Sequence, residues 1–447
     1  MAEPGAQVLE PEVTRRQLVR AVVASTIGTS IEWYDFFLYG FVAALVFGKL
    51  FFPKADPYTG TLLAFATYFG GFAARPIGAF IFGHYGDRIG RKATLITTLV
   101  FMGVATFLIG LVPTYATIGV WGGILLTVLR VLQGVGVGGE WGGSVLLSME
   151  WGHRSKRGFI ASWAQFGVPV GLVLSVGALN FMNAIAGTQG FLNWGWRVPF
   201  LLSIVLFAIG LYIRLQILET PIFARLLEQR RIERHPAREV IKRNWKEIVL
   251  TALIRTGQQT PFYIFVTFVL TYATVTLKFK RGDILNDVLV ASFVSLFTIP
   301  LWSYVSDLIG RKRMYLVGAV AMLIFAYPYF ALLDTRVPAL VFLAIVLSLP
   351  VHDMQYGPQA AFIAEAFTGR LRYSGASLGY HLASITAGGP APLVALWLLQ
   401  TYRTSAAIAA YIMLTAVVSI VSAALLRDRG REDISEEYDR GRAPAPA

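Results

Sequence analysis

The chain has 447 residues, of which 55% are hydrophobic and only 15% are charged, against roughly 25% charged in soluble proteins. With a mean hydropathy of +0.60, this composition excludes a soluble globular domain and predicts an integral membrane protein. The net charge of +13 does not indicate a nucleic-acid partner, because Lys and Arg are concentrated in the predicted inner loops, as the positive-inside rule requires. The absence of cysteine excludes disulfides, thiolate metal ligands and cysteine nucleophiles.

The N-terminal segment does not resemble a cleaved signal peptide. Residues 1–14 contain three Glu and no Lys or Arg, so the first apolar span is expected to remain as a signal anchor. Apolar spans of membrane-crossing length then follow along the whole chain. In order, they are predicted at about 20–50, 59–83, 93–112, 118–149, 158–182, 197–218, 247–276, 285–306, 314–333, 338–366, 374–400 and 403–426.

A polar and strongly basic stretch, residues 219–246, is the longest break in this hydrophobic pattern and lies near the middle of the chain. It predicts a cytoplasmic linker between an N-terminal half and a C-terminal half. The expected organisation is a cytoplasmic tail (1–19), a first half (20–218), the basic linker (219–246), a second half (247–427) and a disordered cytoplasmic tail (428–447).

An internal repeat supports the division into two halves. Residues 87–92 read DRIGRK, and residues 307–312 read DLIGRK, about half a chain later. A looser match relates residues 140–150 to residues 355–365. Repeats in the same order are typical of transporters whose two halves enclose one site near the membrane midplane. The sequence therefore predicts an all-α membrane protein with twelve transmembrane helices in two pseudo-symmetric six-helix halves.

These motifs carry a resemblance to a known family. The turn at residues 83–92 (GHYGDRIGRK) resembles the signature loop of the major facilitator superfamily. Residues 32–36 (EWYDF) and 138–143 (GGEWGG) are similar to its metabolite:proton symporter branch, which includes carriers for shikimate, α-ketoglutarate, citrate, and proline or betaine. Residues 356–362 (YGPQAAF) are closest in wording to the shikimate-like carriers. The resemblance implies the major facilitator fold and transport by alternating access.

The repeated turn is expected to act as a cytoplasmic gate. Glycine lets helix ends approach closely, an aspartate is stabilised at the N-terminus of a neighbouring helix, and an arginine can pair with a carboxylate. The alternative is a plain basic loop on the inner side. The second copy departs from the family pattern, because Ser303 replaces the first glycine and Leu308 the first arginine. The predicted gating residues are Gly83, Asp87, Arg88, Gly90, Arg91, Asp307 and Arg311.

Two carboxylates, Glu32 and Asp35, lie near mid-depth in the first span and share one helix face. A carboxylate there is costly unless it faces a cavity or a partner. Arg130 lies near mid-depth in the fourth span and cannot lose its charge. The resemblance implies a proton-coupling role for Arg130, with Asp35 or, failing that, Glu32 as its partner. A permanent structural ion pair is the alternative.

Two further intramembrane arginines, Arg75 and Arg255, favour a carboxylate substrate, because the guanidinium group binds a carboxylate through two parallel hydrogen bonds. Histidines in the tenth and eleventh spans could relay protons, bind substrate or simply be buried in the core. The predicted substrate-binding residues are Arg75, Arg255, Gln165, Gln258, Gln355, Tyr34, Tyr263, His352 and Tyr356.

Together these patterns predict a proton-coupled secondary symporter that imports a small organic acid, a mono- or dicarboxylate, with shikimate-like acids as one class. A carrier of a zwitterion such as proline or betaine is the alternative. An enzyme, a channel and an ATP-driven pump are disfavoured, because neither a nucleophile with its base nor a filter or phosphate-binding loop is evident. A sensor without transport is a further alternative, which flux of labelled substrate into proteoliposomes would separate. We expect a monomer in the cytoplasmic membrane of a prokaryote, with both termini cytoplasmic. Its expected partners are an organic anion, protons and lipid, with no cofactor, metal or nucleic acid.

Overall fold

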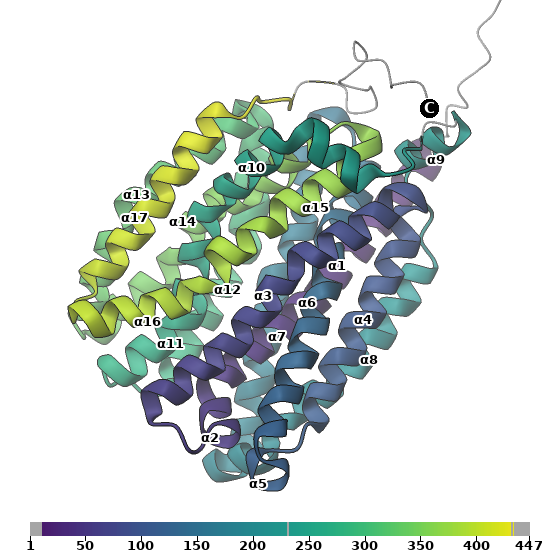
Figure 1. Cartoon of the computed structure of the whole chain (residues 1–447). Coiled ribbons are helices and arrows are strands. Elements are labelled where there is room, and N and C mark those ends of the chain that lie inside the picture. The colour runs from purple at the N-terminus through teal and green to yellow at the C-terminus, as the bar shows by residue number, and fades with distance from the viewer. Residues whose placement is uncertain (1–10, 230–231, 431, 433–447) are drawn as a thin grey trace, which may run out of the picture.

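The computed structural model describes residues 11–229, 232–430 and 432. Residues 1–10 of the expected N-terminal tail and residues 433–447 of the expected disordered C-terminal tail lie outside the described residues. The part of the chain that the structure describes is built from helices and turns, with no strand. This confirms the predicted all-α architecture. Figure 1 shows the early helices, in purple and blue, gathered beside the late helices, in green and yellow.

The first half begins with α1 (Pro11–Val42), which starts before the predicted boundary at residue 20 and continues through the π-helical segment η1 and the short α2. The first-half elements are α1 (Pro11–Val42), η1 (Ala43–Phe47), α2 (Gly48–Phe51), α3 (Pro57–Arg88), α4 (Arg91–Leu111), α5 (Tyr115–Ile118), α6 (Val120–Met149), η2 (Arg154–Lys156), α7 (Arg157–Gly190), η3 (Phe191–Gly195) and α8 (Arg197–Leu215).

The basic stretch between the halves contains α9 (Pro221–Glu228) and the beginning of α10 (Pro236–Tyr263). The remaining elements are η4 (Ile264–Phe268), α11 (Val269–Thr271), η5 (Tyr272–Thr276), α12 (Arg281–Ile309), α13 (Arg311–Asp334), α14 (Pro338–Ala364), η6 (Gly369–Leu371), α15 (Arg372–Ala383), η7 (Ser384–Gly388), α16 (Pro390–Tyr402) and α17 (Ala406–Leu425). Figure 1 places α9 near the upper end of the molecule and α2 and α5 at the opposite, lower end.

Each predicted span corresponds to a helix or to a run of consecutive helices. Among the described residues, 10 helical segments are long and apolar enough to cross a membrane by length and composition. Helices α3 and α10 complete the set of twelve, and they are the ones that carry Arg75 and Arg255.

Equivalent turns end the second span of each half. Gly90, with φ +114°, separates α3 from α4, and Gly310, with φ +105°, separates α12 from α13. A positive φ in this range costs glycine little and strains other residues. The repeated glycine of the DRIGRK and DLIGRK segments thus sets the same sharp reversal twice.

Helices α3 and α6 pack with their backbones in contact. A Cβ atom on Gly134 would collide with the carbonyl oxygen of Gly71, and one on Gly138 with the carbonyl oxygen of Arg75. Small residues let membrane helices approach this closely, which replaces lipid contacts by tight packing. The glycines of α6 therefore fix the position of Arg75 on the neighbouring helix.

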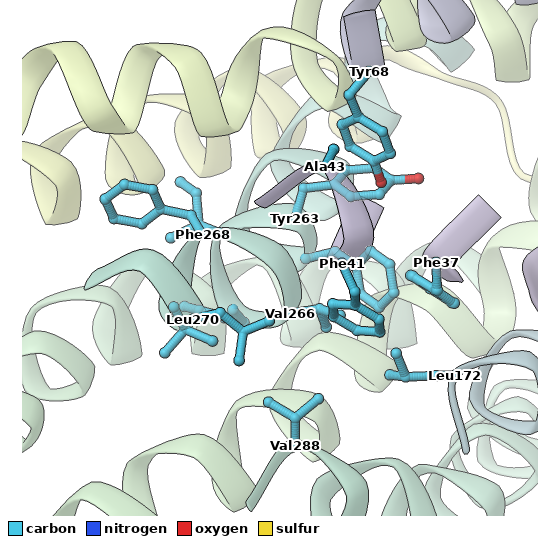
Figure 2. Packing of buried hydrophobic residues seen from close by; sticks show 14 of the residues in the cluster. Phe37, Phe41, Ala43, Tyr68, Leu172, Tyr263, Val266, Phe268, Leu270 and Val288 are labelled. Atoms are coloured by element: carbon cyan, nitrogen blue, oxygen red, sulfur yellow. The ribbon is translucent and has the colours of Figure 1, made fainter. Parts of the chain in front are cut away.

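The two halves meet along several helix pairs, with α7 beside α12 and α3 beside α15. Toward the end where α2 and α5 lie, which we take as the outer end, their interface is an apolar cluster. Figure 2 shows Phe37 and Phe41 of α1 and Leu172 of α7 near Val266 of η4 and Val288 of α12. All five side chains are buried. We call this group the outer plug.

Candidate functional site

Arg75 is a buried arginine whose three guanidinium nitrogens have no hydrogen-bond partner among the described residues. The side chain is only 1% exposed and lies 4.2 Å from the ring centre of Phe36, 4.6 Å from that of Phe72 and 5.8 Å from that of Trp33. Aromatic faces attract a cation without using its N–H groups. The N–H groups of Arg75, which make no hydrogen bond to the described residues, are therefore left to bind another acceptor.

Glu32, Arg255 and His381 belong to the same buried cluster. Glu32 interacts electrostatically with Arg75 and Arg255, and His381 interacts with the same two arginines. These side chains come from α1, α3, α10 and α15, so both halves contribute. The cluster carries more cationic than anionic charge, which favours an anionic guest.

Arg255 is held against α15. Its Nη1 donates a hydrogen bond of 2.6 Å to the carbonyl oxygen of Tyr380, and its guanidinium lies 3.0 Å from the centre of that ring. The opposite face of Tyr380 stacks on Trp141 of α6 at 3.5 Å with an interplanar angle of 9°. This stack joins the second half to the first.

Gln165 was predicted to bind substrate, and the structure gives its amide two protein partners. The indole Nε1 of Trp141 donates to its Oε1 at 2.8 Å, and its Nε2 donates to the carbonyl oxygen of Tyr356 at 3.1 Å. Gln165 thus bridges α6, α7 and α14. Its amide positions the Trp141 ring behind Tyr380.

Several polar atoms of the central region are buried with no hydrogen-bond partner in the described part of the chain. Such groups are costly to bury, so their concentration in one place indicates a site that hydrogen-bonds a polar guest. They are Glu32 Oε2, Trp33 Nε1, the three guanidinium nitrogens of Arg75, Gln258 Oε1, both amide atoms of Gln355 and both ring nitrogens of His381.

The remaining predicted substrate residues fall into two groups. Nε2 of His352 lies 2.5 Å from Nε2 of Gln258. The ring centre of Tyr356 lies 5.1 Å from that of His352. Tyr263 packs against Phe72 across the interface of the halves, at 4.9 Å. In contrast, the hydroxyl of Tyr34 donates to the carbonyl oxygen of Pro199 at 2.9 Å, inside the first half.

Asp35 and Arg130 do not form a direct ion pair. Instead, two polar side chains connect them: Thr106 Oγ1 donates to Asp35 Oδ2 at 2.9 Å, and Gln133 Nε2 donates to Thr106 Oγ1 at 2.7 Å. Arg130 Nη1 donates to Gln133 Oε1. The predicted pair is therefore a chain of hydrogen bonds across α1, α4 and α6, whose two intermediate residues sequence reasoning missed.

Arg130 is otherwise enclosed by aromatic rings. Its guanidinium lies 4.3 Å from the ring centres of Phe36 and Tyr39, and 4.9 Å from that of Tyr68. Phe36 also contacts Arg75 on its other side. One ring therefore separates the arginine of the central cluster from the arginine of the Asp35 chain.

Glu140 forms a buried ion pair that the sequence analysis did not anticipate. Both of its carboxylate oxygens accept hydrogen bonds from Arg214 of α8, and they also accept from Thr98 at 3.0 Å and Ser144 at 2.8 Å. Arg214 follows a long apolar run and ends the sixth span. With four donors, Glu140 is satisfied as a carboxylate and serves to join α6 to α8.

At the end of the molecule away from α2 and α5, Asp87 of α3 caps a helix of the opposite half. Its carboxylate accepts hydrogen bonds from the backbone N–H groups of Tyr373 at 3.2 Å and Ser374 at 2.8 Å, in the first turn of α15. A Cβ atom on Gly83 would lie 2.9 Å from Cα of Ser374. The negative charge at a helix N-terminus and the glycine contact together hold the halves against each other.

The second half repeats this arrangement in reverse. Asp307 of α12 accepts hydrogen bonds from the backbone N–H groups of Gly158 at 3.0 Å and Phe159 at 2.8 Å, at the start of α7. The departures of the second turn do not disturb it, since Leu308 is exposed, as Arg88 is in the first turn. The side chain at this position points away from the contact in both halves.

An arginine of each turn extends the contact into a charge network. Arg91 lies 3.4 Å from Asp87 and 3.6 Å from Glu150 of α6, and Glu150 lies 3.6 Å from Arg372 of the opposite half. All four side chains are buried. We call these groups, together with their symmetric counterparts, the inner lock.

The symmetric counterpart of this network is built around the second turn. Arg311 donates to Asp307 at 2.6 Å and lies 3.4 Å from Glu365, which in turn lies 3.6 Å from Arg157. Asp87 and Asp307 thus meet backbone groups of the opposite half, whereas Arg91 and Arg311 pair with Glu150 and Glu365 of their own halves. Those two carboxylates in turn lie 3.6 Å from Arg372 and Arg157 of the opposite half. The halves are therefore in contact through polar groups at one end and through the outer plug toward the other.

Comparisons with known proteins agree with this architecture. Residues 20–252 match the family model described as sugar (and other) transporter, and residues 288–447 match the major facilitator superfamily model. The shikimate transporter of Escherichia coli K12 is 39% identical over 416 residues, covering 92% of this chain and 95% of that protein. The proline/betaine transporter of the same organism is 32% identical, covering 96% and 86%.

The solved structures give the same fold. The proton:xylose symporter XylE bound to 6-bromo-6-deoxy-D-glucose superposes with a TM-score of 0.75, covering 95% of this chain and 98% of that one. A partially occluded, inward-open structure of XylE from E. coli gives a TM-score of 0.71. At 16% and 17% identity, these similarities concern the fold alone.

Proposed function

Because this chain belongs to the major facilitator superfamily, and its relatives are transporters rather than enzymes, we propose that it is a proton-coupled symporter that imports a small organic acid. The proposal places it in the cytoplasmic membrane of a prokaryote as a monomer, with both termini cytoplasmic. The basic inner loops support that orientation.

The assignment of the substrate class rests on the guanidinium group of Arg75. It is buried, makes no hydrogen bond to the part of the chain that the structure describes, and lies in one cluster with Arg255 and His381. A carboxylate of the substrate would supply the missing acceptors through two parallel hydrogen bonds. The unpartnered Gln258 carbonyl and Trp33 N–H would bind hydroxyl groups of its body. Of the named relatives, the shikimate transporter fits this chemistry, so shikimate is the probe of choice.

A zwitterion carrier is the second candidate, supported by the proline/betaine relatives. A quaternary ammonium group would need open aromatic faces. Here Trp33, Phe36 and Phe72 already face Arg75, and Tyr380 lies between Arg255 and Trp141. The rings are thus used by the protein's own cations, which favours the organic acid.

Proton coupling would act through the chain Asp35–Thr106–Gln133–Arg130. As a carboxylate, Asp35 accepts the Thr106 hydrogen bond. As a neutral acid, it becomes a donor to Thr106 Oγ1, and the Thr106 hydroxyl can then donate to the carbonyl oxygen of Met102 instead. Protonation would also remove the negative charge at the end of the chain that leads to Arg130, whose guanidinium shares the ring of Phe36 with Arg75 of the central cluster.

Alternating access would follow from the unlike closures at the two ends. The inner lock consists of charged groups that separate when water enters, whereas the outer plug consists of packed side chains that separate without loss of hydrogen bonds. Rocking of the halves would open one end while the other stays closed.

A thermal-shift panel on the purified protein tests the substrate class, because a ligand of the folded state raises its apparent stability by mass action. Shikimate, proline and glycine betaine are compared at equal concentration. The proposal predicts a shift with shikimate. A shift with only proline or glycine betaine would establish the zwitterion reading instead.

A further inference from the structure

A second buried titratable pair lies in the C-terminal half, away from Asp35. His352 and Asp353 are consecutive residues of α14, exposed by 1% and 0% respectively. The imidazole Nδ1 of His352 lies 2.9 Å from Asp353 Oδ1. Neither residue belongs to the inner lock or to the Asp35 chain, so the coupling described above leaves this pair unused.

Both carboxylate oxygens of Asp353 have neighbours that can donate hydrogen bonds. Its Oδ2 accepts hydrogen bonds from Ser295 Oγ at 2.6 Å and from Thr298 Oγ1 at 2.5 Å, both on α12. Its Oδ1 lies 2.9 Å from Nδ1 of His352. A carboxylate at this position matches the tautomer with hydrogen on Nδ1, which leaves Nε2 as the ring nitrogen that can gain or lose a proton.

That nitrogen faces Gln258 of α10. The Nε2 atoms of the two residues are 2.5 Å apart, so a neutral His352 accepts a hydrogen bond from the amide NH₂ group. The other amide atom, Oε1, is buried with no partner among the described residues. If Nε2 gains a proton, two donors face each other, and a half-turn of the amide brings Oε1 to Nε2. The two orientations of Gln258 thus match the two protonation states of His352.

We propose that His352, held by Asp353, is a second proton-binding site of this protein, and that the amide of Gln258 transmits its protonation state to the substrate site. The proton enters on Nε2, and the resulting imidazolium is balanced by the Asp353 carboxylate. Gln258 lies one helical turn after Arg255, so its rotation changes which amide group faces the central cluster. The role of Gln258 in transmitting the protonation state rests on the proposed symport function, whereas proton binding by His352 does not.

Groups from four helices surround the pair. On α14, the ring of Tyr356 lies 5.1 Å from that of His352, and Arg255 of α10 and Tyr380 of α15 interact with this tyrosine. Helix α12 contributes the neutral Ser295 and Thr298, and α10 also contributes the ring of Phe262 at 4.7 Å. The carboxylate of Asp353 is in direct contact with the imidazole.

The proton site is tested without any substrate. The protein, labelled with ring-15N histidine and reconstituted in lipid, is titrated by solid-state NMR. We expect one ring signal to change from one protonated nitrogen to two as the sample is acidified, and to be lost in His352→Asn. A His352 ring that remains a single neutral tautomer throughout overturns the proposal.

Transport then tests the coupling to Gln258, with shikimate as the probe in proteoliposomes. His352→Asn keeps a partner for Asp353, and His352→Gln keeps one for Gln258, but neither carries a proton. In both variants, pH-gradient-driven accumulation should fall by at least about tenfold more than exchange does. The exposed His153→Gln is the control. Unchanged accumulation, or equal loss of exchange and accumulation, contradicts the coupling. If the wild type does not transport shikimate at all, the substrate assignment fails, and the NMR titration still decides the proton site.

Discussion

The carboxylate of Asp87 accepts a hydrogen bond of 2.8 Å from the backbone N–H of Ser374, which lies in the opposite half of the molecule. Asp307 and Phe159 repeat this relationship in reverse, at 2.8 Å. Each half thus supplies the acid that caps a helix of the other. This exchange makes the cytoplasmic closure symmetric although the two turns differ in sequence.

Asp87→Asn should weaken the closure at the cytoplasmic end. The substitution keeps the side-chain shape but removes the charge at the N-terminus of α15, at a cost of about 1 kcal/mol. We expect the inward-open population to rise about fivefold. Because the chain contains no cysteine, a single Ser148→Cys probe, buried near this end of α6, reports opening by its rate of maleimide labelling.

Leu308→Arg is the matched control for this experiment. It restores the family pattern in the second turn, and its side chain is 63% exposed and points away from the contact. The labelling rate of the Ser148→Cys probe should stay unchanged. An equal rise in both variants would show that Asp87 does not hold the closure.

Arg75→Lys should impair binding although it keeps the charge. Lysine does not reproduce the planar fork that fits a carboxylate, nor the stacking on Phe36 and Phe72. The apparent affinity for shikimate should fall by about tenfold or more, equivalent to about 1.4 kcal/mol, as measured by the thermal shift. Arg197→Lys on α8, which donates to backbone carbonyls at 2.7 and 2.8 Å, is the control, and an equal loss there would refute a specific role for Arg75.

Gly138→Ala should destabilise the fold because the added methyl group meets the backbone of α3 at Arg75. Overpacking of this kind costs about 1–3 kcal/mol. Gly177→Ala on α7 adds the same methyl group where nothing lies within 4 Å. A lower melting temperature only for Gly138→Ala is the expected result, and similar values for both would show that α3 and α6 can separate freely.

Glu140→Gln should destabilise the first half more than a surface change of the same kind. It leaves Arg214 buried and without a charged partner, at a cost of about 3–5 kcal/mol. Thermal unfolding of the purified variant measures the loss. A melting temperature equal to that of the wild type would mean that the ion pair contributes nothing to the joint between α6 and α8.

The spans and the acid, glycine and arginine of each repeated turn were predictable because their signals are local. Hydrophobic length marks each helix, and the DRIGRK and DLIGRK segments carry the acid, the glycine and the arginine of each turn together. Their partners were not predictable. The backbone amides of Tyr373 and Gly158 that they meet have no side-chain signature.

The buried charge networks show the same limit. Glu32, Asp35, Arg75 and Arg130 stand out in the sequence because they interrupt apolar runs. That Thr106 and Gln133 connect Asp35 to Arg130 depends on how α1, α4 and α6 cross, and neither residue is unusual in a membrane helix. Glu140 and Arg214 are 74 positions apart, so no periodicity relates them.

The central claim is that protonation of Asp35 drives uptake of an organic acid. Its most direct test is accumulation of labelled shikimate by proteoliposomes with an imposed inward proton gradient, comparing the wild type with Asp35→Asn. The account predicts that the wild type accumulates shikimate above equilibrium, whereas Asp35→Asn exchanges it but does not accumulate it. Accumulation by Asp35→Asn equal to that of the wild type would contradict the account.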